Sequence, residues 1–242
     1  MLVAVVSDIH SNLSALQAVL SDLPAVDEVW CLGDIVGYGP DPNECLQTIL
    51  GLKHLAIAGN HDWAAVGLAD LRDFNADARA AALWTAAQLS EANKEIIRRL
   101  PRELAVGDFT LVHGSPRDPI WEYIVSPSQA AMNLSRVSTR FCLVGHTHYP
   151  AVFWGPAGKD PARALRPEPD TAVPLGERRL ILNPGSVGQP RDRDPRASYL
   201  VLDLAQGIAR FHRVAYDIEA TQEKMRQAGL PYSLWARLSV GW

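Results

Sequence analysis

Five short apolar runs in this sequence each end in acidic, amide or imidazole side chains. The runs have the length and composition of buried strands, and they occupy residues 2–6, 29–32, 54–58, 109–112 and 141–144. Their polar ends carry Asp8 and His10, Asp34, Asn60 and His61, His113, and His146 and His148. Because ligands bind outside the carboxyl ends of strands in open α/β sheets, we expect these side chains to form one site.

The last of these ends has two histidines, His146 and His148, directly after Gly145. In an extended chain, residues two apart point to the same side, and Asp8 and His10 repeat this spacing. Two such histidines by themselves are compatible with a metal site, a catalytic pair or ordinary polar residues in a turn. The other strand ends favour the metal site.

The composition is typical of globular proteins. The 242 residues suit one large domain or two small ones, with 48% hydrophobic and 21% charged residues. A net charge of −4 argues against attraction to nucleic acid or to an anionic membrane. The three cysteines fit no zinc pattern and favour buried thiols in a reducing compartment. With neither a signal peptide nor a membrane span predicted, we expect a cytoplasmic protein, and homo-oligomerisation is left open.

Periodicity places the remaining elements. We expect helices near residues 13–20, 43–50 and 128–136, and two more within a helical segment, 67–100, that breaks near Ser90. Further strands are expected at residues 179–182, 198–204 and 208–216, and short helices in a C-terminal tail, 218–242. Residues 155–179 are rich in Pro, Gly, Ala and Arg and predict an irregular insertion. His54 and His212 lie away from the strand ends and are expected to serve packing.

The polar strand ends offer carboxylates, imidazoles and an amide without a thiolate. This mixture suits Mn²⁺, Fe, Ni²⁺ or Zn²⁺. Seven potential ligands exceed the needs of one tetrahedral zinc, but they suit two ions about 3.5–4 Å apart that share a carboxylate. Such a pair stabilises the attacking and leaving oxygens of an in-line displacement at phosphorus, and a further histidine could protonate the leaving group.

Five sequence blocks in order resemble the signature blocks of the calcineurin-like metallophosphoesterases. The blocks are Asp8-Ile9-His10, Gly33-Asp34-Ile35-Val36-Gly37, Gly59-Asn60-His61-Asp62, Val112-His113-Gly114 and Gly145-His146-Thr147-His148. Residues 183–189, NPGSVGQ, are also similar to a later turn of the bacterial phosphodiesterase-like members. The resemblance covers about the first 150 residues and is specific because all five blocks occur in the family's order.

The resemblance implies a fold and a role for each matching residue. It implies an α/β (α+β) fold, with two mixed β-sheets face to face and helices outside, over a single domain of residues 1–242. Asp8, His10 and His148 would hold one metal ion, Asn60, His113 and His146 a second, and Asp34 would bridge the two. His61 would protonate the leaving group, and Asp62 would orient His61. The cofactors would be two divalent ions, with Mn²⁺ favoured and Ni, Co, Fe or Zn as alternatives.

The sequence gives fewer indications of specificity. Tyr38 follows the bridging aspartate, so it is a candidate wall of the substrate site or a plain turn residue. Arg191 and Arg193 follow the NPGS turn and could bind a phosphate, although alternating Arg and Asp residues are usually a solvated face. We expect a phosphodiesterase for nucleotide-type or small phosphodiesters that uses a metal-bridging hydroxide. The alternatives are a phosphomonoesterase or protein phosphatase of the same family, or a metal-binding scaffold without turnover.

Overall fold

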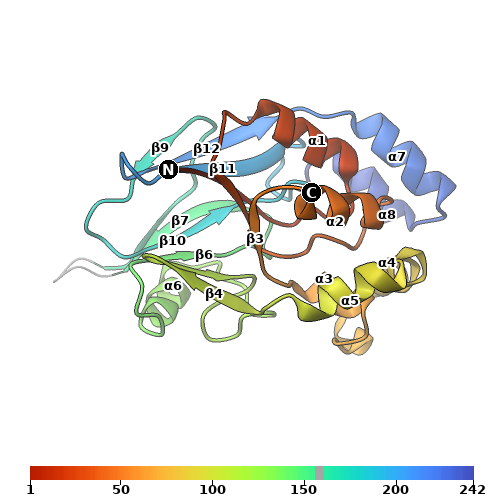
Figure 1. Cartoon of the computed structure of the whole chain (residues 1–242), viewed down its shortest axis with the longest axis horizontal. Helices are drawn as coiled ribbons and strands as arrows, with labels where there is room; N and C mark the ends of the chain where they lie inside the picture. Colours follow the sequence, from red (N-terminus) through yellow and green to blue (C-terminus); the bar gives the residue numbers. More distant parts are fainter. Residues whose placement is uncertain (156–160) are drawn as a thin grey trace.

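The computed structural model describes residues 1–155 and 161–242, and its strands form two six-stranded mixed sheets. The first sheet has the order β3 (His54–Ala56), β2 (Glu28–Cys31), β1 (Leu2–Val6), β11 (Ala197–Asp203), β12 (Ile208–Val214) and β9 (Ala172–Pro174). The second has the order β4 (Glu103–Val106), β5 (Phe109–Val112), β6 (Phe141–Leu143), β10 (Leu180–Pro184), β7 (Pro150–Trp154) and β8 (Arg163–Leu165). The two sheets lie face to face, which confirms the predicted fold (Figure 1).

Each sheet contains three neighbouring parallel strands. These are β1, β2 and β3 in the first sheet, and β5, β6 and β10 in the second, while the other pairings are antiparallel. The carboxyl ends of both sets meet at one end of the sandwich, where the backbone N–H of His146 after β6 donates to the Asp8 carboxylate after β1. The predicted site residues therefore come together from both sheets.

The alternation of side chains along β1 explains why the first sheet packs on both faces, against the second sheet on one side and against helices on the other. Val3 and Val5 point into the core between the sheets, with Phe141 and Leu143 of β6 among the residues opposite. Ala4 and Val6 point outward, into the core beneath the helices that cover the first sheet. Apolar residues on both faces suit a strand that is covered on both sides.

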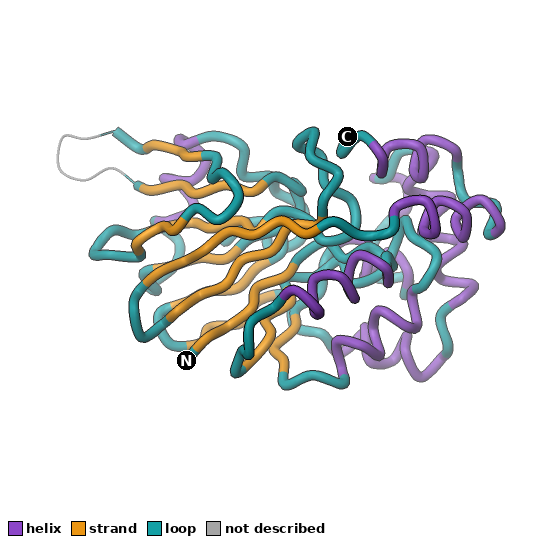
Figure 2. Tube along the Cα trace, turned by 90° about the horizontal axis from the view of Figure 1, so that it is seen from above, coloured by secondary structure: helices purple, strands orange, loops and turns teal. Residues whose placement is uncertain are grey.

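The helices cover the outer faces of the sheets and the end that carries the site. They are α1 (Leu13–Asp22), α2 (Pro42–Leu50), α3 (Asn60–Ala65), α4 (Ala76–Gln88), α5 (Glu91–Arg99), α6 (Pro127–Leu134), α7 (Ile218–Gln227) and α8 (Tyr232–Ala236), with 3₁₀ turns η1 (Leu71–Asp73) and η2 (Arg237–Ser239). Helices α1, α2 and α5 pack on the first sheet and α6 on the second. Figure 2 shows most helices on one side of the molecule, beyond the ends of the strands.

The helical segment 67–100 breaks where the sequence predicts. Ser90 is the N-cap of α5, and its hydroxyl accepts a hydrogen bond from the backbone N–H of Asn93 (3.2 Å). The first long helix of this segment begins only at Ala76, whereas the sequence predicts helix from residue 67. The C-terminal tail, 218–242, contains α7, α8 and η2, as expected.

The prediction of an irregular insertion at 155–179 is wrong for two short stretches. Strand β8 pairs with β7, and β9 pairs with β12, so each extends one edge of a sheet. All three residues of β8 are exposed, which leaves no apolar alternation to reveal the strand. Residues 156–160 of this segment lie outside the described residues.

The three cysteines, Cys31, Cys45 and Cys142, are buried thiols, as predicted. His54 and His212 also lie away from the site, and His212 stacks on Tyr199 (ring centroids 5.0 Å apart). Within the described residues, no helix has the length and apolar character that crossing a bilayer requires.

Candidate metal centre

The turns at the strand ends hold several predicted ligands in an unusual backbone conformation. Asp8, His10, Asp34, His146 and His148 have φ angles of 53°, 50°, 50°, 65° and 62°. Non-glycine residues rarely adopt this left-handed region, at a cost of about 1–3 kcal/mol each. Concentration of such strain at one place indicates a functional site.

These angles correct one expectation from the sequence. The chain is not extended at His146 and His148, so the two imidazoles do not simply point to the same side. His146 lies with Asp34 and His113, whereas His148 lies with Asp8 and His10. The left-handed turn thus gives one histidine to each of two clusters.

The first cluster consists of Asp8, His10 and His148. The Oδ1 atom of Asp8 lies 3.3 Å from Nε2 of His148 and 3.8 Å from Nε2 of His10. The two Nε2 atoms are 3.0 Å apart. The other carboxylate oxygen, Oδ2, accepts hydrogen bonds from the Ser7 hydroxyl (2.6 Å) and the His146 backbone (3.1 Å), which leaves Oδ1 to face the two imidazoles.

The second cluster consists of Asp34, His113 and His146, with Asn60 beside them. Nε2 of His113 lies 3.3 Å from Oδ2 of Asp34 and 3.1 Å from Nδ1 of His146. Oδ1 of Asn60 is also 3.1 Å from Nε2 of His113. The predicted ligands of both ions are therefore brought together in the two groups that the sequence implies.

Asp34 connects the two clusters through one oxygen atom. Its Oδ2 lies 3.3 Å from the His113 nitrogen of the second cluster and 3.7 Å from Nε2 of His10 in the first. Its Oδ1 is occupied by the backbone N–H of His61 at 2.8 Å. Asp34 is therefore placed as a bridging carboxylate would be.

The protonation of three histidines also suits a metal. The nitrogen that faces away from the clusters lies near a backbone carbonyl in His113 (Leu32, 2.8 Å), His146 (Trp121, 3.1 Å) and His148 (Gln189 carbonyl, 2.5 Å). A carbonyl only accepts, so this nitrogen carries a proton, and the inward nitrogen of the neutral imidazole is the one with the lone pair that a metal would use. Carbonyl partners of this kind orient metal-binding imidazoles.

The electrostatics of the site suit a bound cation. Within the described residues, Oδ1 of Asp8 and Oδ2 of Asp34 are buried without a hydrogen-bond partner. Burial lowers the pKa of His146 to about 3, so this imidazole is neutral at pH 7. Burial is the largest single effect on His113 and lowers its pKa, but the Asp34 charge, the hydrogen bond to Asp34 and the Asp8 charge together raise the value to about 9, so this imidazole is protonated at pH 7 when no metal is bound. Buried carboxylates beside imidazole nitrogens fit two divalent ions well, and a metal would replace the inward proton of His113.

Two glycines lie where a side chain would clash with Asp34 or His61. A Cβ atom on Gly59 would lie 2.1 Å from Oδ1 of Asp34. Gly37 has a φ of +98°, and a Cβ there would lie 2.9 Å from Nδ1 of His61. The glycines of the second and third sequence blocks are therefore required by the close approach of Asp34 and His61 to the backbone.

Asn60 and His61 lie in the first turn of α3. Asn60 reaches the second cluster. The His61 ring lies 4.2 Å from the Tyr38 ring and 5.0 Å from the His10 ring, between centroids. Burial lowers the pKa of His61 to about 4. His61 therefore faces the centre as a neutral imidazole without being part of either cluster.

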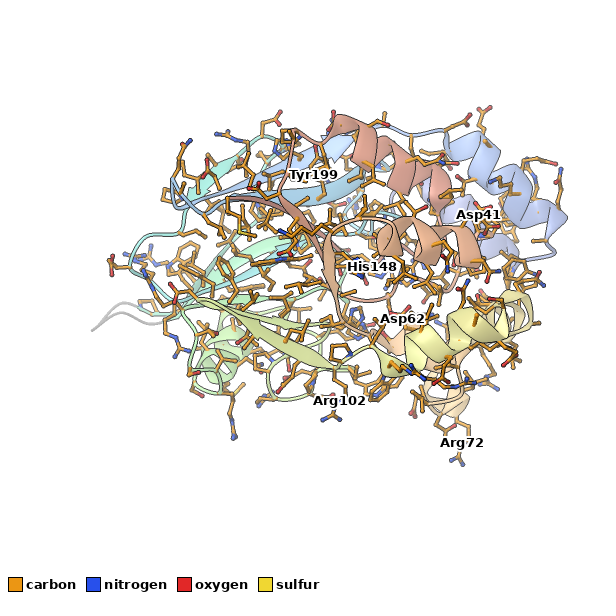
Figure 3. The ribbon with its side chains drawn as sticks, viewed as in Figure 1. Asp41, Asp62, Arg72, Arg102, His148 and Tyr199 are labelled. Atoms are coloured by element: carbon orange, nitrogen blue, oxygen red, sulfur yellow. The ribbon has the colours of Figure 1, made fainter. Side chains whose placement is uncertain are left out.

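Asp62 does not contact the His61 imidazole, so the expectation that it orients His61 directly is corrected. Its two oxygens accept hydrogen bonds from the backbone N–H groups of Val36 (3.0 Å) and Gly59 (2.9 Å). Asp62 is fully buried and joins the loop after Asp34 to the start of α3. Figure 3 shows Asp62 and His148 in the middle of the molecule.

The structure places the residues predicted to bind substrate in two different surroundings. The guanidinium of Arg191 lies 5.8 Å from the centre of the Tyr38 ring and donates to the Gln189 side chain (2.9 Å). Tyr38 in turn lies against the His10 ring, with centroids 4.6 Å apart, so Arg191 lies next to the first cluster. Arg193 is exposed, lies over the Trp242 ring at 5.4 Å, and belongs to neither metal cluster.

Two features of the site were not predicted from the sequence. Tyr123 stacks on His146, with ring centroids 4.0 Å apart and an angle of 10° between the planes. It comes from a loop without a recognisable motif. Asn183, in the NPGS turn, donates to the carbonyl of Gly145 (2.7 Å) and the hydroxyl of Thr147 (3.0 Å). The turn was recognised in the sequence, but its bonds to the loop between His146 and His148 were not.

The fold and the two ligand clusters define a dinuclear metal-binding α/β protein. The family model described as "Calcineurin-like phosphoesterase superfamily domain" matches residues 1–207, so the chain belongs to this family. The protein is accordingly a metal-dependent phosphoester hydrolase whose centre holds two metal ions.

Individual similar proteins match the chain over different lengths. A metallophosphoesterase from Sphaerobacter thermophilus has a similar structure, with 46% identity, a TM-score of 0.92 and coverage of 100% of this chain and 99% of that one. An uncharacterised protein of Methanocaldococcus jannaschii is 38% identical over 99% of this chain and 98% of its own length. A shorter match, 41% identical over 63 residues, covers 24% of this chain and 23% of a symmetrical bis(5'-nucleosyl)-tetraphosphatase of Actinobacillus pleuropneumoniae.

Proposed function

We propose that this protein is a phosphodiesterase that acts on nucleotide-type or small phosphodiesters. The observation that carries the proposal is the position of Asp34, whose Oδ2 lies between the His10 and His113 nitrogens of two buried clusters. When bound, two divalent ions would lower the pKa of a water molecule and offset the charge of the phosphoryl group.

Each cluster would hold one ion. Asp8, His10 and His148 would bind the first, Asn60, His113 and His146 the second, and Asp34 both. We propose Mn²⁺ as the native metal, because mixed carboxylate, imidazole and amide ligands without a thiolate suit it. Nickel, cobalt, iron and zinc are the alternatives that the same ligands allow.

His61 would donate a proton to the leaving-group oxygen, which requires that the anionic phosphoester bound beside it raise the pKa of the imidazole from about 4, so that it is protonated. Its Nδ1 lies against Gly37, where a Cβ would come within 2.9 Å, so Nε2 is the nitrogen left to meet the substrate. The short distance between the His61 and Tyr38 rings fixes the orientation of the imidazole. A positioned acid of this kind typically contributes about 10²–10⁴-fold to the rate.

Arg191 would bind a nonbridging phosphoryl oxygen or a second phosphate. Gln189 and Tyr38 hold its guanidinium beside the clusters, which reduces the entropy that it would lose on binding an anion. The local similarity to a bis(5'-nucleosyl)-tetraphosphatase supports a nucleotide-type substrate.

The proposal is tested by removing the metal and restoring single ions. The panel would contain bis(p-nitrophenyl) phosphate, p-nitrophenyl phosphate, cyclic nucleotides and dinucleoside polyphosphates, with Asp34→Asn as the variant. We expect turnover only with added Mn²⁺, Ni²⁺ or Co²⁺, and a higher kcat/KM for diesters than for monoesters. Full turnover in excess chelator, after metal loss is verified, would contradict the mechanism. A higher kcat/KM for the monoester would make the protein a phosphomonoesterase.

We also propose that the protein acts in the cytoplasm. The three cysteines are buried and form no disulfide within the described residues, which suits a reducing compartment. Fractionation of cells of the source organism, followed by detection of the protein, tests this location. Recovery from a secreted fraction would contradict it.

A further inference from the structure

A cavity of about 390 Å³ lies beside the metal centre, and neither the metal ligands nor Arg191 line it. Its wall includes Thr147, the residue between His146 and His148, followed along the chain by Tyr149, Pro150 and Ala151. On another side it is bounded by Ile124 and Val125, directly after Tyr123. Since Tyr123 stacks on His146 and directly precedes Ile124, one edge of the cavity is joined through the chain to a residue that contacts the second metal cluster.

The residues that surround the cavity expose an unusual amount of apolar surface. Tyr149 is 40% exposed, Leu165 42% and Val125 67%, and the neighbouring Tyr123 is 45% exposed. These are four of the eleven large hydrophobic side chains that are exposed in the described part of the chain. Contiguous exposed apolar side chains generally mark a binding surface. The volume lies in the range of about 300–1,000 Å³ that is usual for small-ligand sites.

The charge of the lining selects for an anionic or neutral ligand. Among the described residues that line the cavity there is no carboxylate and one cation, Arg166. Arg166 donates to the carbonyl oxygen of Asp192 (2.6 Å) and to its carboxylate (3.0 Å). Asp192 is buried, also pairs with Arg213, and directly follows Arg191. The rim of the cavity is therefore tied to the loop that carries the guanidinium facing the metal centre.

We propose that this cavity binds the organic group of the phosphoester, and that it selects a planar aromatic group such as a nucleobase or an aryl ring. The inference rests on the proposed function, because it places the phosphoryl group at the two metal clusters. From there, a group attached to phosphorus would pass Tyr123 and Thr147 into the cavity. It would contact the exposed ring of Tyr149 and the side chain of Leu165, and an aromatic ring gains most from such a surface.

The experiment compares three p-nitrophenyl phosphodiesters that differ only in the second ester group: methyl, phenyl and 5'-thymidyl. We expect the wild-type kcat/KM to be about tenfold or more higher for the phenyl and thymidine esters than for the methyl ester, as expected for stacking of one ring. This aromatic-to-methyl ratio should fall about tenfold in Tyr149→Ala and in Leu165→Ser. The matched control is Tyr232→Ala, which removes a tyrosine that is 71% exposed on α8, and it should keep the wild-type ratio.

A binding measurement separates failure of this proposal from failure of the proposed function. Calorimetric titration of the Mn²⁺-loaded protein with phenylphosphonate and methylphosphonate needs no turnover. Tighter binding of phenylphosphonate, lost in Tyr149→Ala, would support the cavity even if no diester were hydrolysed. Equal affinities for the two phosphonates would overturn the proposal, and so would equal kinetic losses for all three esters. Sedimentation that shows a dimer dissociated by Leu165→Ser would also overturn it, because a second copy would then fill the cavity.

Discussion

The substitution Asp62→Ala tests whether this carboxylate holds two loops together. The Asp62 oxygens accept from the backbone N–H groups of Val36 (3.0 Å) and Gly59 (2.9 Å) in a fully buried position. A buried donor left without its partner costs about 1–3 kcal/mol. The two donors together predict that the free energy of unfolding falls by about 2–6 kcal/mol, a large part of the about 5–15 kcal/mol typical of a domain.

Urea unfolding of the metal-free protein measures this loss without a contribution from bound ions. The control is Asp70→Ala, because Asp70 is exposed and pairs with Arg72 at the surface, and it should change stability by less than about 0.5 kcal/mol. If Asp62→Ala unfolds at the wild-type urea concentration while turnover falls, the account is wrong. Asp62 would then act on His61 in solution, as the sequence first indicated.

Three further predictions concern residues around the metal clusters. Asn60→Ala should lower the occupancy of one metal ion, and excess Mn²⁺ should partly restore it. His61→Ala should keep both ions and lose about 10²–10⁴-fold in turnover, with a smaller loss for substrates that have good leaving groups. Loss of a metal ion in His61→Ala would show that His61 is a ligand. Arg191→Ala should raise KM without changing metal content, and Arg193→Ala should leave KM unchanged; equal effects would contradict the separation of the two arginines. Gly37→Ala should place a methyl group 2.9 Å from the His61 ring and reduce kcat with both metals retained; wild-type kcat would show that His61 does not depend on this contact.

The sequence predicted the residues of the centre better than their geometry. Local patterns place Asp8, Asp34 and His113 at the ends of apolar runs, and the parallel order of the strands brings those ends together. The left-handed backbone at His146 and His148 is not visible in a sequence, because it depends on bonds from other segments. The sequence therefore predicted an extended segment from His146 to His148.

The edge strands and the loop residues were not predictable in the same way. The strands β8 and β9 are three residues long and mostly exposed, so their pairing depends on the neighbouring strand and leaves no apolar pattern. Tyr123 reaches His146 only because the loop after His113 folds over the second cluster. Asp62 was assigned to His61 from their adjacency, whereas in a helix its side chain turns toward Val36 and Gly59.

The central claim is that Asp34 joins two adjacent metal ions in one centre. Electron paramagnetic resonance of the Mn²⁺-loaded protein, combined with metal analysis, tests it most directly. We expect two ions per chain and the spectrum of a spin-coupled pair, because Oδ2 of Asp34 lies 3.7 Å from the His10 nitrogen and 3.3 Å from that of His113. We also expect Asp34→Asn to lose the coupled signal. One ion per chain, or two ions with the spectrum of isolated Mn²⁺, would contradict the claim.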